Sequence, residues 1–345
     1  MPRPSQKLIA QKLGISTATV SLALRNKGTV SKKLADRVKA VAEEIGYKPN
    51  PILASLASQH FKSSESSLGI PIALIDFLDT PYNKASYFNP IQERAHELGY
   101  SITHITPKEL KSYHSPDKTL YNRGVQGIIL LGPVSDRTFR DDFDWSLFSV
   151  LLCGRFLAPL PFDTVRPNIF QSVNLAYQQV RAHGYKRIGL AIGRHEPMME
   201  DDASRYSAAL GIQRIEEPDA ELIPPYFGPL EDDQKLVSWV REHDPDCVIG
   251  FHVGQCSTMR DEGINIPEDL AYASLHIAES QIIGGEKPLC VAGNEQNKRE
   301  IAIQCMNLMD QKVKYHERGI PEFPKHILIN STWLDGESLP DKTKG

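Results

Sequence analysis

Apolar positions near the N-terminus recur at helical spacing. Within residues 5–24 they are Leu8, Ile9, Leu13, Ile15, Val20 and Leu24. The segment Gly14-Ile15-Ser16 interrupts this pattern with a glycine that can adopt positive φ and a serine that can cap a following helix. The pattern therefore predicts two short helices joined by a tight turn, which is a helix-turn-helix.

A third helix is predicted directly afterwards. Ser31 is placed to cap it, and the helix should stop at Gly46, with Pro49 just beyond. The apolar residues of its inner face are Leu34, Val38, Val41, Ala42 and Ile45. Three helices in about fifty residues form a minimal core, and by pattern alone any small helical bundle would also fit.

From Leu68 onward, strand-like and helix-like stretches alternate. The predicted strands are Ile70–Phe77, Ser101–Ile105, Gly127–Leu131, Ser149–Leu152, Arg187–Ile192, Glu221–Ile223, Cys247–Phe251 and Leu270–Ser274. The predicted amphipathic helices are Phe88–Leu98, Ile169–His183, Asp233–His243 and Lys298–Met309. This alternation indicates right-handed βαβ units with parallel sheets, and its length favours two doubly wound halves over one sheet.

Composition sharpens this division. The 345 residues, 41% apolar and 24% charged, are typical of an ordered globular chain of two or three domains. The net charge of −4 is unevenly distributed: residues 1–62 hold eleven Lys and Arg against three acidic residues, a net of +8, and the remainder carries −12. A basic head on an acidic body is expected of a protein that binds nucleic acid at one end.

Several functional classes are disfavoured by what the sequence lacks. It has no apolar run of signal-peptide or membrane-spanning length, so we expect a cytoplasmic protein with no membrane partner. The five cysteines form no CxxC pair, which argues against a metal site or a disulfide framework. We find none of the common nucleotide-binding, zinc-hydrolase or serine-hydrolase motifs, and expect neither an enzyme nor a cofactor.

Three segments of the head carry a specific resemblance. Leu13-Gly14-Ile15-Ser16-Thr17-Ala18-Thr19-Val20-Ser21, then Val30-Ser31, then Ile45-Gly46-Tyr47-Lys48-Pro49-Asn50 closely resemble, in order, the headpiece of the LacI/GalR (lactose-repressor-like) family of transcriptional regulators. The resemblance implies a DNA-binding headpiece over residues 1–49 and base-reading positions at Thr17, Ala18 and Leu22. These side chains can offer a hydroxyl and apolar contact but cannot form the bidentate guanine contact of arginine.

Further polar residues of the headpiece match family positions that contact DNA phosphates. Such contacts set the affinity of the protein for DNA and its register on the duplex. The residues are Ser16, Thr19, Ser21, Asn26, Lys32 and Lys33. Taken singly, each fits equally well as a helix cap or a solvated charge. A hinge helix and linker are expected over residues 50–66, where Leu56 matches the family leucine that wedges into the minor groove. An ordinary linker with one helical turn is the alternative for that segment.

The resemblance extends more loosely through the body. Its segments are Arg123–Leu130, Gly184–Gly189 and Ile266–Leu270. It implies an α/β periplasmic-binding-protein-like domain over residues 67–335, with two lobes, three chain crossovers and a ligand cleft, followed by a tail at 336–345. By that analogy lobe 1 is about 67–167 and 296–325, and lobe 2 is about 168–295 and 326–335.

The same resemblance implies a set of effector-binding residues. Carried over position by position, they are Arg205, Asn168, His252, His276, Phe227, Tyr226 and Gln296. His252 and His276 stand where the family usually has Asn and Asp, which weakens the transfer of any particular sugar, because aspartate grips sugar hydroxyls through paired acceptors.

The prediction is therefore a transcriptional regulator with repression as the family's default sign. It would bind operator DNA as a homodimer, since one headpiece reads only half a site, and a small molecule, expected to be a carbohydrate, would modulate it. The absence of a C-terminal leucine heptad argues against a tetramerising coiled coil. The alternative is a cytosolic sugar-binding protein of the same fold with no role on DNA.

Overall fold

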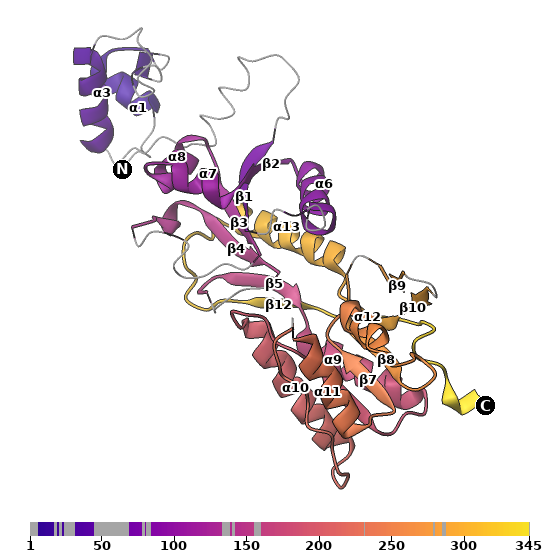
Figure 1. Ribbon diagram of the computed structural model, residues 1–345. Coiled ribbons are helices and arrows are strands. Elements are labelled where there is room, and N and C mark those ends of the chain that lie inside the picture. Colours follow the sequence, from indigo (N-terminus) through magenta and orange to yellow (C-terminus); the bar gives the residue numbers. More distant parts are fainter. Residues whose placement is uncertain are drawn as a thin grey trace. The chain divides into compact units, whose positions relative to one another are not determined.

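The computed structural model shows two compact units (Figure 1). The residues it describes are 6–16, 19–20, 23, 32–44, 69–77, 80, 84–132, 139, 142–154, 160–230, 232–278, 280–284 and 288–344. The first unit comprises residues 1–68 with 122–124, and the second comprises residues 69–121 and 125–345.

The first unit is helical, as its apolar spacing predicts. Helices α1 (Gln6–Leu13) and α3 (Lys32–Glu44) pack together. Their shared core also takes residues of the predicted second helix, and its buried members are Ile9, Ala10, Val20, Ala23, Val38 and Ala42. So few buried side chains can stabilise only a small domain.

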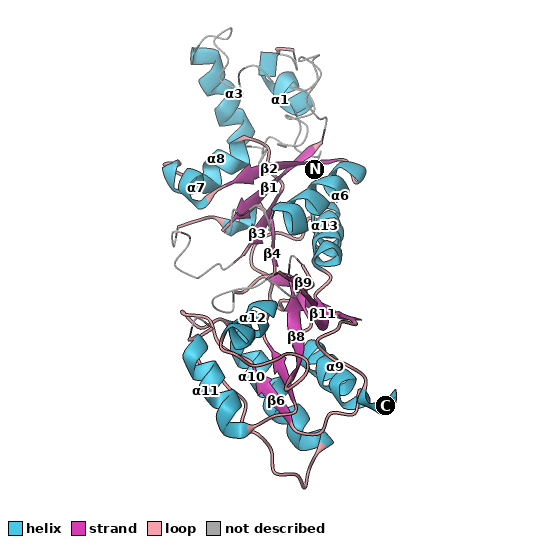
Figure 2. Cartoon of the chain, turned by 45° about the vertical axis from the view of Figure 1, so that its right-hand side comes forward, coloured by secondary structure: helices cyan, strands magenta, loops and turns pink. Residues whose placement is uncertain are grey.

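The second unit contains two sheets with helices on both faces, which we call lobe 1 and lobe 2 (Figure 2). Lobe 1 has a parallel six-stranded sheet in the order β12-β5-β4-β3-β1-β2. Its strands are β1 (Ile70–Asp76), β2 (Tyr100–Ile105), β3 (Gly127–Leu131), β4 (Ser149–Cys153), β5 (Asp163–Pro167) and β12 (His326–Ile329). Strands β3 and β4 are buried at every position, as expected where helices cover both faces of a parallel sheet.

Helices α6 (Asn89–Glu97) and α13 (Lys298–Lys314) cover one face of the lobe 1 sheet. The opposite face packs against α7 (Pro107–Ser112), α8 (Pro116–Asn122) and an aromatic group that includes Phe143 and Phe148. A buried ion pair fixes α13 to this lobe: the Lys312 ammonium lies 2.5 Å from the Asp163 carboxylate at the start of β5. Both side chains are almost completely enclosed.

Lobe 2 has a five-stranded sheet in the order β13-β11-β8-β7-β6, parallel except for the antiparallel pair β11–β13. Its strands are β6 (Ile188–Ala191), β7 (Cys247–Gly250), β8 (Ala271–Ile277), β11 (Ala292–Glu295) and β13 (Thr332–Leu334). The surrounding helices are α9 (Ile169–Ala182), α10 (Glu200–Glu216), α11 (Asp233–His243) and α12 (Val253–Asp261). A short ribbon, β9 (Ile282–Ile283) with β10 (Leu289–Cys290), lies beside them.

The chain crosses between the lobes three times, after β5, after β11 and between β12 and β13. The predicted doubly wound, two-lobed architecture is therefore present. The lobe division differs in one place from the expected one. Residues 326–329 pair with β5 in lobe 1 and 332–334 pair with β11 in lobe 2, so the third crossover lies between these strands.

One predicted strand is wrong. Residues 221–223 form no strand, and only an isolated bridge joins Tyr226 to Ala191. The reason is visible in the sequence, because Pro224 and Pro225 follow at once and cannot donate hydrogen bonds to a neighbouring strand.

Candidate functional site

The first candidate site is the turn of the helix-turn-helix unit. Gly14 has φ +66°, which allows α1 to end sharply. The Ser16 hydroxyl accepts a hydrogen bond from the Thr19 backbone N–H at 3.1 Å and also bonds the Thr19 hydroxyl at 2.8 Å. Ser16 therefore caps the next helix as predicted, and Lys33 is exposed on α3.

Most of the predicted DNA-contacting residues lie outside the described part of the chain. They are Thr17, Ala18, Ser21, Leu22, Asn26 and Leu56, and the side chain of Lys32 belongs with them. Their roles stay predictions.

The second candidate site lies at the carboxyl edge of the lobe 2 sheet. Strands β6, β7, β8 and β11 run parallel, so the residues that follow or end them share one edge. Ligands of open α/β sheets bind at this edge. In strand order it carries His195 after β6, His252 after β7, His276 near the end of β8 and Gln296 after β11.

Phe251 organises this edge. The Arg205 guanidinium lies 4.2 Å from the centre of the Phe251 ring, a cation–π contact. The rings of His195, His252 and His276 lie 5.4, 5.6 and 6.0 Å from the same ring, centre to centre. The predicted residues Arg205, His252 and His276 are thus brought together around an aromatic side chain that the sequence did not single out.

Asp202 holds two members of this group in place. Its Oδ1 accepts hydrogen bonds from His195 Nδ1 at 2.8 Å and from Arg205 Nη1 at 3.0 Å. Its Oδ2 accepts the backbone N–H groups of His195 and Met199, both at 2.9 Å. Burial raises the pKa of Asp202, but these hydrogen bonds and the imidazole charge outweigh it and hold the pKa well below its usual range. Asp202 is therefore an ionised anchor.

His252 has a defined hydrogen-bonding polarity. Its Nδ1 accepts the backbone N–H of Gly254 at 2.9 Å, so the imidazole caps α12. In the neutral ring the proton must then be on Nε2, which is a donor. A Cβ on residue 254 would lie 2.7 Å from His252 Cε1, and the glycine thus leaves the space that the imidazole occupies.

An ion pair connects this edge to lobe 1. Arg166 on β5 places Nη1 3.1 Å from Glu200 Oε1 and 3.7 Å from Asp201 Oδ1. Glu200 and Asp201 form the first turn of α10, the helix that also carries Asp202 and Arg205. Helix α10 therefore joins the polar group around Phe251 to lobe 1 through this ion pair.

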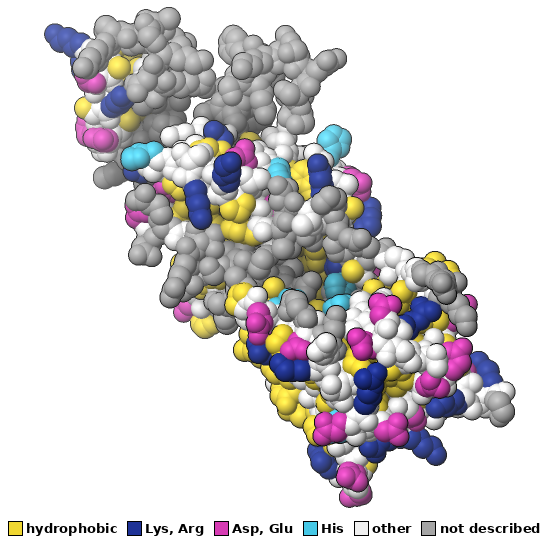
Figure 3. All heavy atoms as spheres, in the orientation of Figure 1, with side chains coloured by type: hydrophobic (Ala, Val, Ile, Leu, Met, Phe, Trp, Pro, Cys, Tyr) yellow, Lys and Arg dark blue, Asp and Glu magenta, His cyan; other side chains and the backbone are white. Residues whose placement is uncertain are grey.

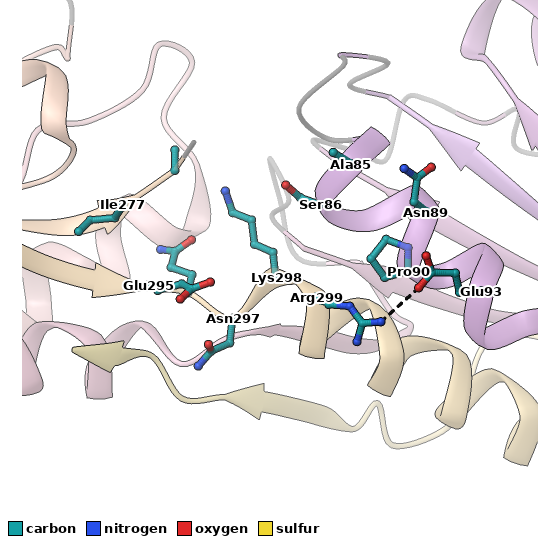
Figure 4. A pocket seen from close by; sticks show the side chains of 12 residues that line it. Ala85, Ser86, Asn89, Pro90, Glu93, Ile277, Glu295, Asn297, Lys298 and Arg299 are labelled. Atoms are coloured by element: carbon teal, nitrogen blue, oxygen red, sulfur yellow. Dashed lines mark hydrogen bonds and ion pairs between the residues drawn. The ribbon is translucent and has the colours of Figure 1, made fainter. Parts of the chain in front are cut away.

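A cavity of about 300 Å³ opens between the lobes at the β8 and β11 end of the same edge (Figure 4). Lobe 1 lines it with Ser86, Asn89 and the start of α6, and lobe 2 with Ile277. The predicted residue Gln296 also lines it and is 5% exposed. The Lys298 side chain, at the first position of α13, extends into the space between the two sides.

Three predicted effector residues lie apart from Phe251. Asn168 caps α9: its Oδ1 accepts the Gln171 N–H at 3.2 Å, and its Nδ2 donates to Asn330 at the third crossover. Tyr226 is buried in the core beside Trp239 and donates its hydroxyl proton to a backbone carbonyl. Phe227 stacks on Tyr206 at 4.4 Å. Contact of these three residues with an effector stays a prediction.

The described residues hold no group of three or more His, Cys, Asp or Glu side chains that could bind a metal ion. In the same part of the chain, no helix is long and apolar enough to cross a membrane.

Comparison with known proteins shows what the chain resembles. Residues 7–50 match the family model for bacterial regulatory proteins of the lacI family. The head of the chain is therefore similar to that family. Among curated relatives, the HTH-type transcriptional repressor CytR of Escherichia coli K12 is 26% identical over 77% of this chain and 78% of its own. The repressor PurR of Actinobacillus pleuropneumoniae is 21% identical over 94% and 97%.

Solved LacI-family structures share the fold. A lac repressor dimer bound to operator and the anti-inducer ONPF matches with a TM-score of 0.61 at 15% identity, covering 96% of this chain and 98% of that one. A complex of the transcriptional regulator CelR with cellobiose matches with a TM-score of 0.55 at 16% identity, over 97% and 100%.

Proposed function

We propose that this chain is a LacI-family DNA-binding transcriptional repressor whose operator affinity is set by a small molecule bound at the carboxyl edge of the lobe 2 sheet. The observation that carries the proposal is the helical unit built on α1 and α3. Its sharp Gly14 turn and Ser16 cap lie in the segment that matches the lacI family model. We infer that it acts in the cytoplasm and catalyses no reaction.

The DNA contacts follow from helix-turn-helix geometry. The second helix, with Thr17, Ala18 and Leu22 as the base-reading residues, would enter the major groove, while the basic residues of the head neutralise phosphates. One such unit reads half a site, so the operator is a pseudo-palindrome bound by a homodimer. Leu56 would wedge into its centre.

The effector site follows from the two-lobed body. Arg205, His252 and His276 around Phe251, with Gln296 at the cavity, offer polar groups on lobe 2, and Arg166 ties this region to lobe 1. A ligand that binds one lobe arrangement more tightly shifts the equilibrium between arrangements and thereby changes operator affinity.

Selection of binding sites from a random duplex library with the full-length protein tests the proposal. We expect enrichment of one pseudo-palindromic sequence. A Thr17→Val/Leu22→Ala variant, with unchanged helical content, should lose that enrichment. A protein that retains ligand binding but enriches no sequence would support the alternative, a small-molecule binding protein without a role on DNA.

A further inference from the structure

Amide side chains gather at the three crossovers between the lobes. Each crossover carries an asparagine: Asn168 in the first, Asn297 in the second and Asn330 in the third. We propose that these amides join the crossovers into one pivot, and that Asn168 and Asn297 are positioning residues that set the angle between the lobes. The consequence for operator affinity rests on the proposed function.

Asn168 bonds the first crossover to the third. Its Nδ2 donates to Asn330 Oδ1 at 2.9 Å, and its backbone N–H donates to the Ile329 carbonyl at 2.8 Å. Its Oδ1 caps α9 by accepting the Gln171 N–H at 3.2 Å. Both polar ends of this side chain have partners within the protein. They support a positioning role in place of the effector contact that the resemblance implies.

Asn297 bonds the second crossover to the third. Its Nδ2 donates to the Asn330 backbone carbonyl at 2.8 Å. Figure 4 shows its side chain directed to the opposite side of the backbone from Lys298, which extends into the inter-lobe cavity. Asn330 is therefore bonded from both of the other crossovers, once at its side chain and once at its backbone.

Gln171 fastens the third crossover to lobe 2. Its Oε1 accepts the Ser331 N–H at 2.9 Å, and its Nε2 donates to the Ser331 carbonyl at 3.4 Å. One side-chain amide thus pairs with both backbone groups of a residue, as a neighbouring strand would. Because Gln171 lies on α9, the third crossover can move only together with the start of that helix, unless these bonds break.

The backbone of Asn297 directs the chain from lobe 2 into lobe 1. It is in the left-handed conformation, φ +51°, immediately before α13, which packs on the lobe 1 sheet. Among residues other than glycine, asparagine and aspartate tolerate this conformation best. Lobes turn through φ and ψ changes at a few residues of this kind. A different lobe angle that altered this backbone would also displace the Asn297 amide from Asn330.

These bonds connect segments that move relative to one another when one lobe rotates on the other. They can therefore all form in only one lobe arrangement, and they favour that arrangement over the others. Asn330 is exposed, so each bond competes with water and its net effect is modest. Loss of one bond should shift the equilibrium between arrangements by about two- to fivefold, and loss of both asparagine donors by about five- to thirtyfold.

The test removes both donors and keeps the helix cap. Asn168→Ser retains an oxygen to cap α9 but is too short to reach Asn330. Asn297→Asp retains the tolerance of the left-handed conformation but has no N–H to donate. Asn307→Asp is the matched control, because it removes an amide donor within α13 alone, where Asn307 Nδ2 donates to Gln304 at 3.4 Å.

Pulsed electron–electron double resonance on the full-length protein measures the distance between the lobes. Spin labels at Lys111→Cys on α7 and Gln178→Cys on α9 occupy exposed positions, one in each lobe. Cys290→Ser removes the half-buried thiol, and the other four cysteines are buried. Excess unlabelled protein ensures that each assembly contains at most one labelled chain.

We expect one main distance in the labelled parent. In Asn168→Ser/Asn297→Asp, the ratio of other distances to the main one should rise by about five- to thirtyfold. Asn307→Asp should match the parent. An unchanged distribution in the double variant would overturn the inference, as would a lower Tm with no new distance or an equal change in Asn307→Asp.

A conservative variant provides the rescue. Asn168→Asp still caps α9, and its second oxygen can accept from the Asn330 amide once that amide turns over. It should therefore keep the parent distribution, whereas Asn168→Ser alone should shift the ratio by about two- to fivefold. Equal shifts in Asn168→Asp and Asn168→Ser would show that the bond to Asn330 is not what positions the lobes.

DNA binding of the same variants separates this inference from the proposed function. If lobe angle sets operator affinity, the double variant should change the dissociation constant for the selected duplex and Asn307→Asp should not. New distances with unchanged operator affinity would overturn the link to DNA. If the parent selects no DNA sequence, the repressor proposal fails, and the distance measurement still decides whether the crossover amides position the lobes.

Discussion

Asp202 is the residue on which the lobe 2 edge depends. Its carboxylate accepts from Arg205, from the His195 side chain and from two backbone N–H groups of the segment that leads into α10. Removing one partner of a buried ion pair leaves the other charge uncompensated. The position of Arg205 is therefore controlled by a side chain that does not itself need to contact a ligand.

We predict that Asp202→Asn lowers the free energy of unfolding by about 3 kcal/mol at pH 7. The pKa of Asp202 is depressed in the folded protein, so its stabilisation is present above the unfolded-state pKa of about 4 and is lost as pH falls through the folded-state pKa. Urea unfolding monitored by circular dichroism measures the loss. Asp232→Asn, which changes the cap of α11, should cost clearly less, and equal costs for the two variants would contradict the anchoring role.

Leu56 is the hinge residue whose predicted role can be tested. The hinge lies outside the described residues. We expect Leu56→Ala to weaken operator binding severely, because a methyl group cannot wedge between base pairs and kink the duplex. Effector binding, measured by thermal shift, should stay unchanged. Unchanged operator affinity in a fluorescence anisotropy titration would show that Leu56 does not wedge into the DNA.

The roles of residues in short ordered motifs were predictable. The roles of residues whose side chains meet only in the folded structure were not. The spacing of Gly14 and Ser16 was enough to predict the turn and cap that the structure shows. Phe251 gave no signal, since one aromatic residue at the end of a predicted strand is expected in the core. Asp202 reads as an ordinary acidic residue in a first helical turn. Its four hydrogen-bond donors all lie within seven residues of it, but they converge only through the conformation of the loop that leads into α10.

Among the elements, α10 couples the two lobes. Its first turn contacts Arg166 of β5, and the same turn carries Asp202 and precedes Arg205. A displacement of α10 on ligand binding would therefore change an ion pair with lobe 1.

We predict a coupling energy of about 1 kcal/mol between Arg166 and Glu200 in a double-mutant cycle, since the pair is partly exposed. The variants are Arg166→Met, Glu200→Gln and their combination, read by urea unfolding. The exposed pair Arg94–Glu97 within α6 serves as the reference and should show a smaller coupling. Additive effects of the Arg166 and Glu200 substitutions would show that this ion pair does not link the lobes.

The longer, continuously apolar strands of the body were predictable, because burial on both faces of a parallel sheet leaves a clear run. Strands β5, β11, β12 and β13 were missed. They are three to five residues long, and Arg166, Pro167, Gly293 and Asn294 among them mask the pattern. The predicted strand at 221–223 failed for the opposite reason: an apolar pair suggested a strand that the following prolines prevent.

At the scale of the whole molecule, the DNA-binding head is basic and the effector-binding body is acidic. The head carries +8 and the rest of the chain −12, so attraction to phosphates is confined to one end. On the face shown in Figure 3, basic and acidic side chains are interspersed over lobe 2 rather than gathered in one patch. A surface of mixed charge does not favour contact between this face and the phosphates of DNA.

This division predicts a steep salt dependence of DNA binding. Affinity for the selected duplex should fall by about a thousandfold between ~50 and ~200 mM salt, as released counterions require for several neutralised phosphates. Fluorescence anisotropy at a series of salt concentrations gives the slope. Lys33→Ala should reduce the slope by about one, and a flat dependence would argue against phosphate-driven binding.

We propose that a ligand at the lobe 2 edge and DNA at the headpiece are coupled in one molecule. The most direct test is the affinity of the full-length protein for its selected duplex, with and without a saturating ligand found by thermal-shift screening. We predict a change of about 5- to 150-fold in the dissociation constant, lost in His252→Asp. An identical operator affinity at proven ligand saturation would contradict the account.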